Sequence, residues 1–277
     1  MIKQAIIPLA GLGTRLLPLT SVIPKELLPI NGKPGLEYIL DECVQSGISE
    51  VIFIISKRKK AIKQYFHNDQ FYKKILKKKK DKRVEEQYKK IKKYKKMVKF
   101  VYQNSAKGTG DAVLKCKNLI KSNFFLMLMP DDLIIKNNCS KSMIALHKKF
   151  KSSVIASKKV KRNNVSRWGI FKVKKINKRN FIIEDVIEKP SVNKAPSRYA
   201  VIGRYILPKK IFKILKKQKP GQNGEIHITD SIRTLILNEN KFIGHIFAGK
   251  YLDCGTMKGY INSTLEISKN NLWKYVW

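Results

Sequence analysis

A short apolar run near the N-terminus leads directly into a glycine turn, and this junction constrains what the chain can fold into. Residues 5–9 have the length and hydrophobicity of a buried β-strand. Gly11 and Gly13 follow it, and glycines after a strand allow main-chain N–H groups to approach an anion closely. Arg15 then supplies a fork-shaped cation and Lys25 a point charge. The stretch therefore predicts a polyphosphate site at the end of a strand.

Two common phosphate motifs are excluded by the residues around these glycines. No Gly-Lys-Ser/Thr follows, so the turn is not a P-loop, and Leu16 stands where a dinucleotide fingerprint has its third glycine. A tight surface turn with two solvated cations would use the same residues. The glycine pair alone does not separate these interpretations.

The pattern of apolar residues predicts an α/β fold. Apolar positions at 36, 39, 40, 43 and 44 have helical spacing and lie between apolar runs at 5–9 and 51–55. Strand, helix and strand in this order predict a parallel pair with a right-handed crossover. Further strands are expected at 98–102, 124–129, 153–160, 169–174, 181–188, 199–207 and 242–248, helices at 112–119, 209–217 and 229–237, and a turn at 107–110.

Two longer stretches at the glycine turn resemble a known family. Gly-Leu-Gly-Thr-Arg-Leu-Leu-Pro at 11–18 and Ile-Pro-Lys-Glu-Leu-Leu-Pro at 23–29 are similar to the signature of bacterial UTP–glucose-1-phosphate uridylyltransferases, which are sugar-nucleotide nucleotidyltransferases. Four shorter motifs occur in the same order as in the family and extend the resemblance over about residues 3–268. They are Ala-Lys-Gly at 106–108, Val-Ile-Gly-Arg-Tyr at 201–205, Ile-Thr-Asp at 228–230 and Asp-Cys-Gly at 253–255.

The resemblance implies the architecture and the reaction. The expected fold is a Rossmann-like mixed, mainly parallel sheet flanked by helices, of the nucleotide-diphospho-sugar transferase type. One domain, 1–277, is expected, with a nucleotide-binding half (about 1–150) and a sugar-binding half with a C-terminal helix (151–277). The implied reaction is Mg²⁺-assisted transfer of the uridylyl group of UTP to α-D-glucose 1-phosphate, which gives UDP-glucose and pyrophosphate.

This chemistry needs no base or activated nucleophile. The attacking phosphate oxygen is already ionised near neutral pH, so catalysis is mostly positioning and electrostatic stabilisation. The four histidines form no cluster along the chain, which agrees with this expectation. Mg²⁺ takes few protein ligands when phosphates are bound, so two carboxylates suffice.

The resemblance also implies the role of each site residue. Arg15 and Lys25 are expected on the β- and γ-phosphates, and Lys189 on the sugar phosphate and the α-phosphate. Gln103 is expected to read uracil, because an amide pairs well with an imide edge. The complete expected sets are Ala10, Gly11, Gly13, Gln103, Gly108 and Asp131 for the nucleotide, Gly169, Glu188 and Gly203 for glucose, and Asp131 and Asp253 for Mg²⁺.

Each short pattern also has a plainer interpretation. Gln103 and Gly108 suit a strand end and a turn, residues 188–190 suit a surface turn, and Asp131 and Asp132 suit a helix cap. The order of the patterns along the whole chain favours the family. The sequence departs from the family at three positions: Ser21 replaces a usual lysine, Asp111 a usual histidine and Trp168 a usual tyrosine. Ser21 would weaken phosphate neutralisation.

The net charge of +39 is large and spread along the chain. It argues for a polyanion partner or for a mutational bias toward AT-rich codons, which favour lysine, and the even spread favours the bias. Residues 73–99 concentrate lysine yet keep helical apolar spacing, so they predict a basic, partly mobile helical insertion. Two alternatives to the uridylyltransferase remain: a polyanion- or RNA-binding protein on a degenerate fold, and a relative that uses another nucleotide or sugar.

Location and assembly are the last expectations. No apolar stretch approaches the ~20 residues of a membrane span, and the N-terminal residues lack a signal-peptide pattern, so a cytoplasmic protein without membrane or specific nucleic-acid binding is expected. The four scattered cysteines predict reduced, buried thiols. The resemblance implies a homo-oligomer, a dimer or a tetramer.

Overall fold

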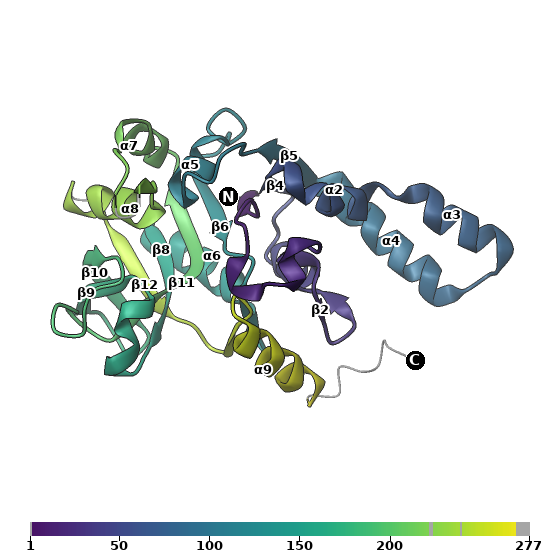
Figure 1. The fold of residues 1–277 in the computed structure, drawn as a ribbon. Helices are drawn as coiled ribbons and strands as arrows, with labels where there is room; N and C mark the ends of the chain where they lie inside the picture. The colour runs from purple at the N-terminus through teal and green to yellow at the C-terminus, as the bar shows by residue number, and fades with distance from the viewer. Residues whose placement is uncertain (1, 222–223, 239, 270–277) are drawn as a thin grey trace.

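A nine-stranded sheet organises the computed structural model, which describes residues 2–221, 224–238 and 240–269 (Figure 1). The strand order is β5-β4-β1-β6-β11-β8-β12-β10-β9, and two small sheets, β13-β7 and β2-β3, accompany it. The strands are β1 Gln4–Pro8, β2 Pro29–Ile30, β3 Lys33–Pro34, β4 Glu50–Ile55, β5 Val98–Tyr102, β6 Phe124–Leu128, β7 Asp132–Ile135, β8 Ser153–Lys159, β9 Ile170–Lys175, β10 Asn180–Ile187, β11 Tyr199–Pro208, β12 Phe242–Ile246 and β13 Lys250–Asp253.

The strand directions confirm the expected mixed, mainly parallel sheet. Strands β5, β4, β1 and β6 are parallel neighbours, as the strand–helix–strand pattern predicted. Strand β11 runs antiparallel between β6 and β8, and β10 runs antiparallel between β12 and β9. Seven of the nine strands therefore point the same way. The helices are α1 Gly35–Gln45, α2 Lys60–His67, α3 Asp69–Lys78, α4 Lys82–Met97, α5 Thr109–Leu114, α6 Cys139–Phe150, α7 Ile211–Lys217, α8 Ile228–Leu237 and α9 Met257–Ser268.

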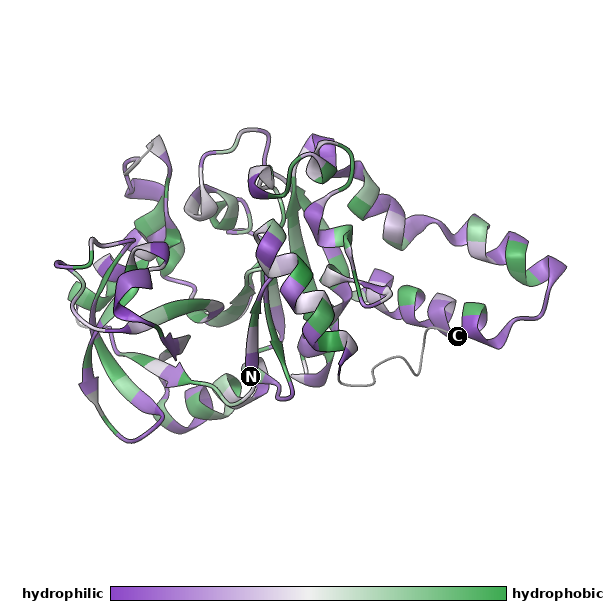
Figure 2. Cartoon of the chain, turned by 60° about the horizontal axis from the view of Figure 1, so that its bottom comes forward, coloured by the Kyte–Doolittle hydropathy of each residue, from purple (hydrophilic) through white to green (hydrophobic). Residues whose placement is uncertain are grey.

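Alternating side chains place a core on each face of the sheet. Ile7 and Phe53 pack with apolar residues of α1, α2, α4, α6 and α9, whereas Ile6 and Ile54 pack with those of α5, α7 and α8. Because both faces are covered, the strands carry unbroken apolar runs. Figure 2 shows these apolar strands in the middle of the molecule, with polar residues on the outer sides of the helices.

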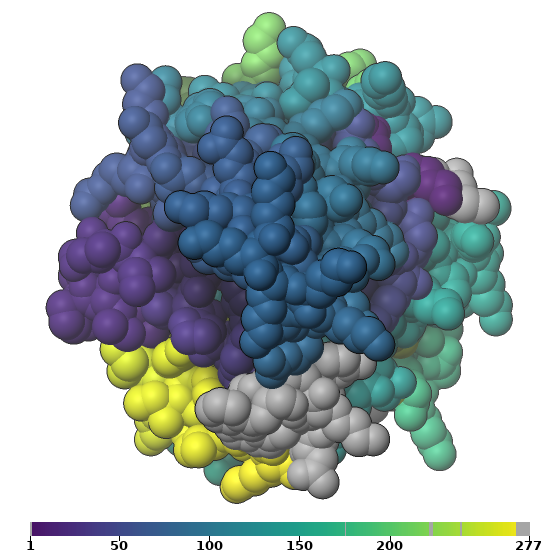
Figure 3. All heavy atoms as spheres, turned by 90° about the vertical axis from the view of Figure 1, so that its right-hand side faces the viewer, coloured from purple at the N-terminus to yellow at the C-terminus, as the bar shows by residue number. Residues whose placement is uncertain are grey.

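The lysine-rich segment forms a helical arm on the connection from β4 to β5. Helices α3 and α4 project from the body, and Figure 3 looks along them from their far end. Stacked rings of Tyr72 and Tyr88, 5.1 Å apart, join the two helices, and Lys95 pairs with Asp69. Helices α3 and α4 cover most of the segment 73–99 that was predicted as a helical insertion, but α3 begins four residues earlier, at Asp69, and residues 98–99 belong to β5.

Some predicted elements differ in extent. Helix α5 begins within the predicted turn 107–110 and ends at Leu114 rather than at 119, because the main chain tightens into turns there (Cys116 N–H to Val113 O, 2.9 Å). Strands β7 and β13 and helix α6 were not predicted. All four cysteines are free and buried, as expected. Among the described residues, no helix is long and apolar enough to cross a membrane.

Candidate active site

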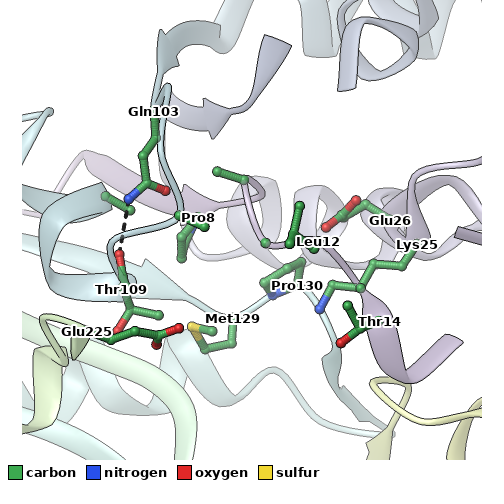
Figure 4. Close-up of a pocket in the computed structure, with 16 residues that line it drawn as sticks. Pro8, Leu12, Thr14, Lys25, Glu26, Gln103, Thr109, Met129, Pro130 and Glu225 are labelled. Atoms are coloured by element: carbon green, nitrogen blue, oxygen red, sulfur yellow. Dashed lines mark hydrogen bonds between the residues drawn. The ribbon is translucent and has the colours of Figure 1, made fainter. Parts of the chain in front are cut away.

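A pocket of about 310 Å³ opens at the carboxyl ends of β1, β5 and β6, where open α/β sheets bind ligands (Figure 4). Its wall comes from the loop after β1, the segment after β5, the end of β6 and one residue of the second half. The lining residues are Pro8, Ala10, Gly11, Leu12, Gly13, Thr14, Lys25, Glu26, Gln103, Ala106, Gly108, Thr109, Ala112, Met129, Pro130 and Glu225. The structure therefore gathers most of the predicted nucleotide residues around one cavity.

The glycine loop offers main-chain donors to this pocket. Within the described residues, no hydrogen bond uses the N–H groups of Gly11, Leu12 or Gly13. The loop is held from behind, because the Thr20 hydroxyl donates to the Gly13 carbonyl at 2.9 Å. Successive unpaired N–H groups beside a cavity suit a bound anion. The loop thus has the chemistry that the sequence predicted for a polyphosphate.

The second half of the chain closes one wall of the pocket at Gly108. Gly108 has φ +95°, and a Cβ atom there would lie 2.6 Å from the Ile226 carbonyl oxygen. The Gly110 N–H donates to the same oxygen at 2.7 Å, and the Ile226 N–H donates to Lys107 at 2.9 Å. Only glycine fits this approach. Glu225, which precedes Ile226, consequently reaches the pocket.

A buried ion pair lies beside the glycine loop. Lys25 Nζ lies 2.8 Å from Asp131 Oδ2, and Arg15 Nη2 lies 3.7 Å from the same oxygen. Burial lowers the pKa of Lys25, but the charges of Asp131 and Glu26 outweigh it and raise that pKa overall. Burial raises the pKa of Asp131, and Lys25 outweighs it in the opposite direction. Both groups are therefore charged at neutral pH.

Asp253 faces the same small volume as Asp131. A Cβ atom on Gly255 would lie 2.7 Å from Asp131 Oδ2, 3.2 Å from Asp253 Oδ1 and 3.1 Å from Arg15 Nη2. Gly255 donates its N–H to Asp253 Oδ1 at 2.9 Å, and Arg167 Nη2 lies 3.2 Å from Asp253 Oδ2. Two carboxylates from distant segments thus converge over a position that has no side chain.

This pair fits a Mg²⁺ ion bound together with phosphates. No cluster of three or more His, Cys, Asp or Glu side chains suited to a metal occurs in the described part of the chain. Mg²⁺ retains waters and takes oxygen ligands from one or two carboxylates plus substrate phosphates. Asp131 and Asp253 meet that requirement, with their oxygens facing the space above Gly255.

Asp132, next to Asp131, is a structural carboxyl rather than a helix cap. Its Oδ2 accepts from the Gly203 N–H at 2.8 Å and its Oδ1 from the Tyr251 hydroxyl at 2.6 Å. Burial, together with the Asp131 charge, raises the pKa of Asp132 to about 6. The cap interpretation of these aspartates is wrong, because Asn138 caps the next helix, α6.

The predicted sugar residues lie on neighbouring strands of the second half. A Cβ atom on Gly169 would lie 3.2 Å from Glu188 Oε2, so that carboxylate packs over Gly169. Gly203 packs against Met129, which lines the pocket. Lys189 has an exposed side chain, and it makes no ion pair among the described residues. The structure therefore groups Gly169 with Glu188, whereas no described contact joins the Lys189 side chain to Asp131 or Asp253.

Sequence reasoning missed several residues at the site, including two charged ones. Arg167 pairs with Asp253, 86 positions away, and Glu225 lines the pocket from an irregular loop. Neither belongs to a periodic pattern. The Arg167 guanidinium lies 4.8 Å from the ring centre of Trp168. The sequence Arg-Trp-Gly at 167–169, next to the predicted sugar residue Gly169, was the one feature that could have indicated Arg167.

Comparisons with known proteins agree with this geometry. The family model described as nucleotidyl transferase matches residues 4–270. A UTP–glucose-1-phosphate uridylyltransferase of Bacillus subtilis is 35% identical over 271 residues, which cover 96% of this chain and 91% of that protein. The crystal structure of a UDP-glucose pyrophosphorylase complexed with UDP-glucose superposes with a TM-score of 0.87 at 35% identity, over 98% of this chain and 100% of that one. A UTP-bound enzyme from Acinetobacter baumannii gives 0.87 at 30% identity, over 98% and 95%.

Proposed function

This chain belongs to the nucleotidyl transferase family, and on that premise we propose that it transfers the uridylyl group of UTP to α-D-glucose 1-phosphate, giving UDP-glucose and pyrophosphate. The observation that carries the proposal is the convergence of Arg15, Lys25, Asp131 and Asp253 at the edge of the glycine-loop pocket. A protein selected only for basic charge has no need of two carboxylates from distant segments at one point.

We divide the reaction between two sides of the pocket. We assign the triphosphate to the N–H groups of Gly11, Leu12 and Gly13, with Arg15 and Lys25 on the phosphates that leave. The phosphate oxygen of glucose 1-phosphate attacks the α-phosphorus in line, and the bond to pyrophosphate breaks. Negative charge then grows on the leaving group, where cations lower the barrier most.

The sugar side is assigned to the strands that carry Gly169, Glu188 and Gly203. A carboxylate over a surface without side chains suits sugar hydroxyls, which donate to Glu188 while the ring packs on glycine. Lys189 is assigned to the sugar phosphate, because it directly follows Glu188 and its charged side chain is exposed. We also propose that Asp131 and Asp253 hold Mg²⁺, which supplies charge neutralisation on the phosphates when bound.

The reaction is tested by coupled pyrophosphate release with each common nucleoside triphosphate and several sugar 1-phosphates. We expect UTP with glucose 1-phosphate to give the highest kcat/KM. Release that is faster with another nucleotide or sugar would reassign the chain within its family. No release with any pair, from folded protein with Mg²⁺, would contradict the proposal.

The metal assignment is tested by Asp131→Asn and Asp253→Asn, which remove charge but keep shape. Each is expected to lower turnover by at least ~10²-fold, as when a key electrostatic group is lost. Asp185→Asn is the matched control, because Asp185 pairs with Arg233 outside the pocket. Near-normal turnover of both variants at saturating Mg²⁺ would remove these carboxylates from the site. The dimer or tetramer implied by the family stays a prediction, to be measured by light scattering.

A further inference from the structure

The orientation of one side-chain amide in the pocket wall is fixed by the chain itself. Gln103 is almost fully buried at the end of β5, and its main-chain N–H donates to the Ile55 carbonyl at 3.0 Å. Its Nε2 donates to Asp111 Oδ2 at 2.8 Å and to the Gly108 carbonyl at 3.2 Å. Both amide hydrogens are therefore used by acceptors of the protein itself.

The amide oxygen is left for a ligand. No hydrogen bond within the described residues reaches Gln103 Oε1, and Gln103 lines the pocket. In Figure 4 the dashed bond leaves the amide nitrogen, while the oxygen lies on the side of Pro8. If the amide turned over, its oxygen would face the Asp111 carboxylate and the Gly108 carbonyl. That arrangement loses two hydrogen bonds and places acceptors against each other.

Asp111 is itself held in place. It is 7% exposed and belongs to the first turn of α5, and Lys115 Nζ lies 3.4 Å from its Oδ1. The contact to Gln103 uses the other oxygen, Oδ2, so the two partners do not compete. A carboxylate acceptor makes a stronger hydrogen bond than a neutral carbonyl. Of the two acceptors on the amide, Asp111 therefore contributes more to its orientation.

We propose that Asp111 is a positioning residue that sets base specificity: it holds the Gln103 amide with its oxygen toward the base, where it accepts from the N3–H of uracil. This inference rests on the proposed function, because it assumes a uridine nucleotide in this pocket. Uracil presents a donor at N3, whereas cytosine presents an acceptor there. A fixed acceptor at Gln103 Oε1 pairs with the first and repels the second.

The test compares nucleotides rather than total activity. Asp111→Asn keeps the shape, but its side chain accepts or donates equally well. Only the weaker contact to the Gly108 carbonyl then favours the original orientation, so the Gln103 amide turns more readily and offers Nε2 to cytosine. We expect the ratio of kcat/KM for UTP to that for CTP to fall by about tenfold, the scale of one lost charge-assisted hydrogen bond. The UTP-to-dTTP ratio should stay unchanged, because thymine carries the same imide edge as uracil.

A double-mutant cycle separates positioning from general support of the fold. In a Gln103→Leu background, Asp111→Asn should not change the UTP-to-CTP ratio further, because the amide through which it acts is gone. Asp185→Asn is the matched control and should leave the ratio as in the wild type, because Asp185 pairs with Arg233 outside the pocket. Melting temperatures of all variants show whether each one folds.

The outcomes distinguish this inference from the proposed function. If Asp111→Asn lowers kcat/KM for UTP and CTP equally, or leaves their ratio unchanged, the positioning role is wrong while the uridylyltransferase stands. If the wild-type chain does not prefer UTP over CTP, the proposed function itself is wrong at the nucleotide.

Discussion

Breaking the buried ion pair between Arg204 and Glu42 should lower the stability of the fold more than breaking any other ion pair described above. Arg204 is fully buried in β11, and its Nη2 lies 2.8 Å from Glu42 Oε2 of α1. The same guanidinium donates from Nη1 to the carbonyls of Gly203 (2.9 Å) and Met129 (3.2 Å). Glu42 in turn accepts from the Ser140 hydroxyl at 2.6 Å. The Arg204–Glu42 pair thus joins the sheet, two helices and the end of β6.

Arg204→Met should destabilise the fold by about 3–5 kcal/mol, because it leaves the Glu42 carboxylate buried without its counter-charge. For a chain of this size that corresponds to a fall in melting temperature of roughly 6–20 °C. Glu42→Leu alone should be similarly severe. The double variant Glu42→Leu/Arg204→Met should be markedly more stable than either single one, since no unpaired charge remains.

The measurement is guanidinium unfolding followed by circular dichroism for the wild type, both single variants and the double variant. Arg233→Met is the control, because that arginine is half exposed and its pair with Asp185 should contribute only about 0–1 kcal/mol. A loss below about 1 kcal/mol in Arg204→Met, or a double variant whose loss equals the sum of the singles, would refute the reasoning.

Three further predictions concern charge. Lys25→Ala should lower kcat, whereas Lys189→Ala should also raise the apparent KM for glucose 1-phosphate, because it removes ground-state attraction to that substrate; a rise only in the KM for UTP would contradict the division of the pocket. Replacing the exposed lysines Lys78, Lys79 and Lys93 by glutamine should weaken retention on a cation-exchange column and leave kcat unchanged, since exposed charges act through a screened field. Loss of kcat in a folded variant would show that the arm takes part in the reaction. The folded pKa of Asp132, about 6, lies above its unfolded value near 4. The unfolded chain therefore releases this proton first, and the carboxyl reduces stability as the pH rises from about 4 to about 6. Melts of Asp132→Asn should lack that slope, and an unchanged slope would refute the assignment.

The strands with unbroken apolar runs could be predicted from the sequence because burial on both faces leaves no polar positions. Strand β6, Phe124–Leu128, is the clearest case. Helix α6 was missed because Cys139, Met143 and Ile144 form a narrow apolar face among lysines. Strands β7 and β13 pair only with each other, from segments more than 100 residues apart, and neither alternates clearly.

The site was predictable where chemistry is local and not where it depends on long-range contact. Glycines after a strand, followed by Arg15 and Lys25, indicate an anion site without any knowledge of the fold. The pairing of Lys25 with Asp131 joins positions 106 apart, and nothing in either segment specifies it. The bond from Gln103 to Asp111 spans eight positions, but it depends on a turn at Gly108 that only the approach of Ile226 explains.

The placement of β11 has a consequence for synthesis on the ribosome. Strand β6 ends at Leu128, but its second neighbour, β11, ends at Pro208. The ribosome adds about 5–20 residues per second, so this edge of β6 stays unpaired for roughly 4–16 s before β11 has been synthesised. During this interval, a five-residue strand of Phe, Leu and Met with no charge is open to pairing with other chains. A chaperone that binds the nascent chain during this interval would therefore protect it most from aggregation.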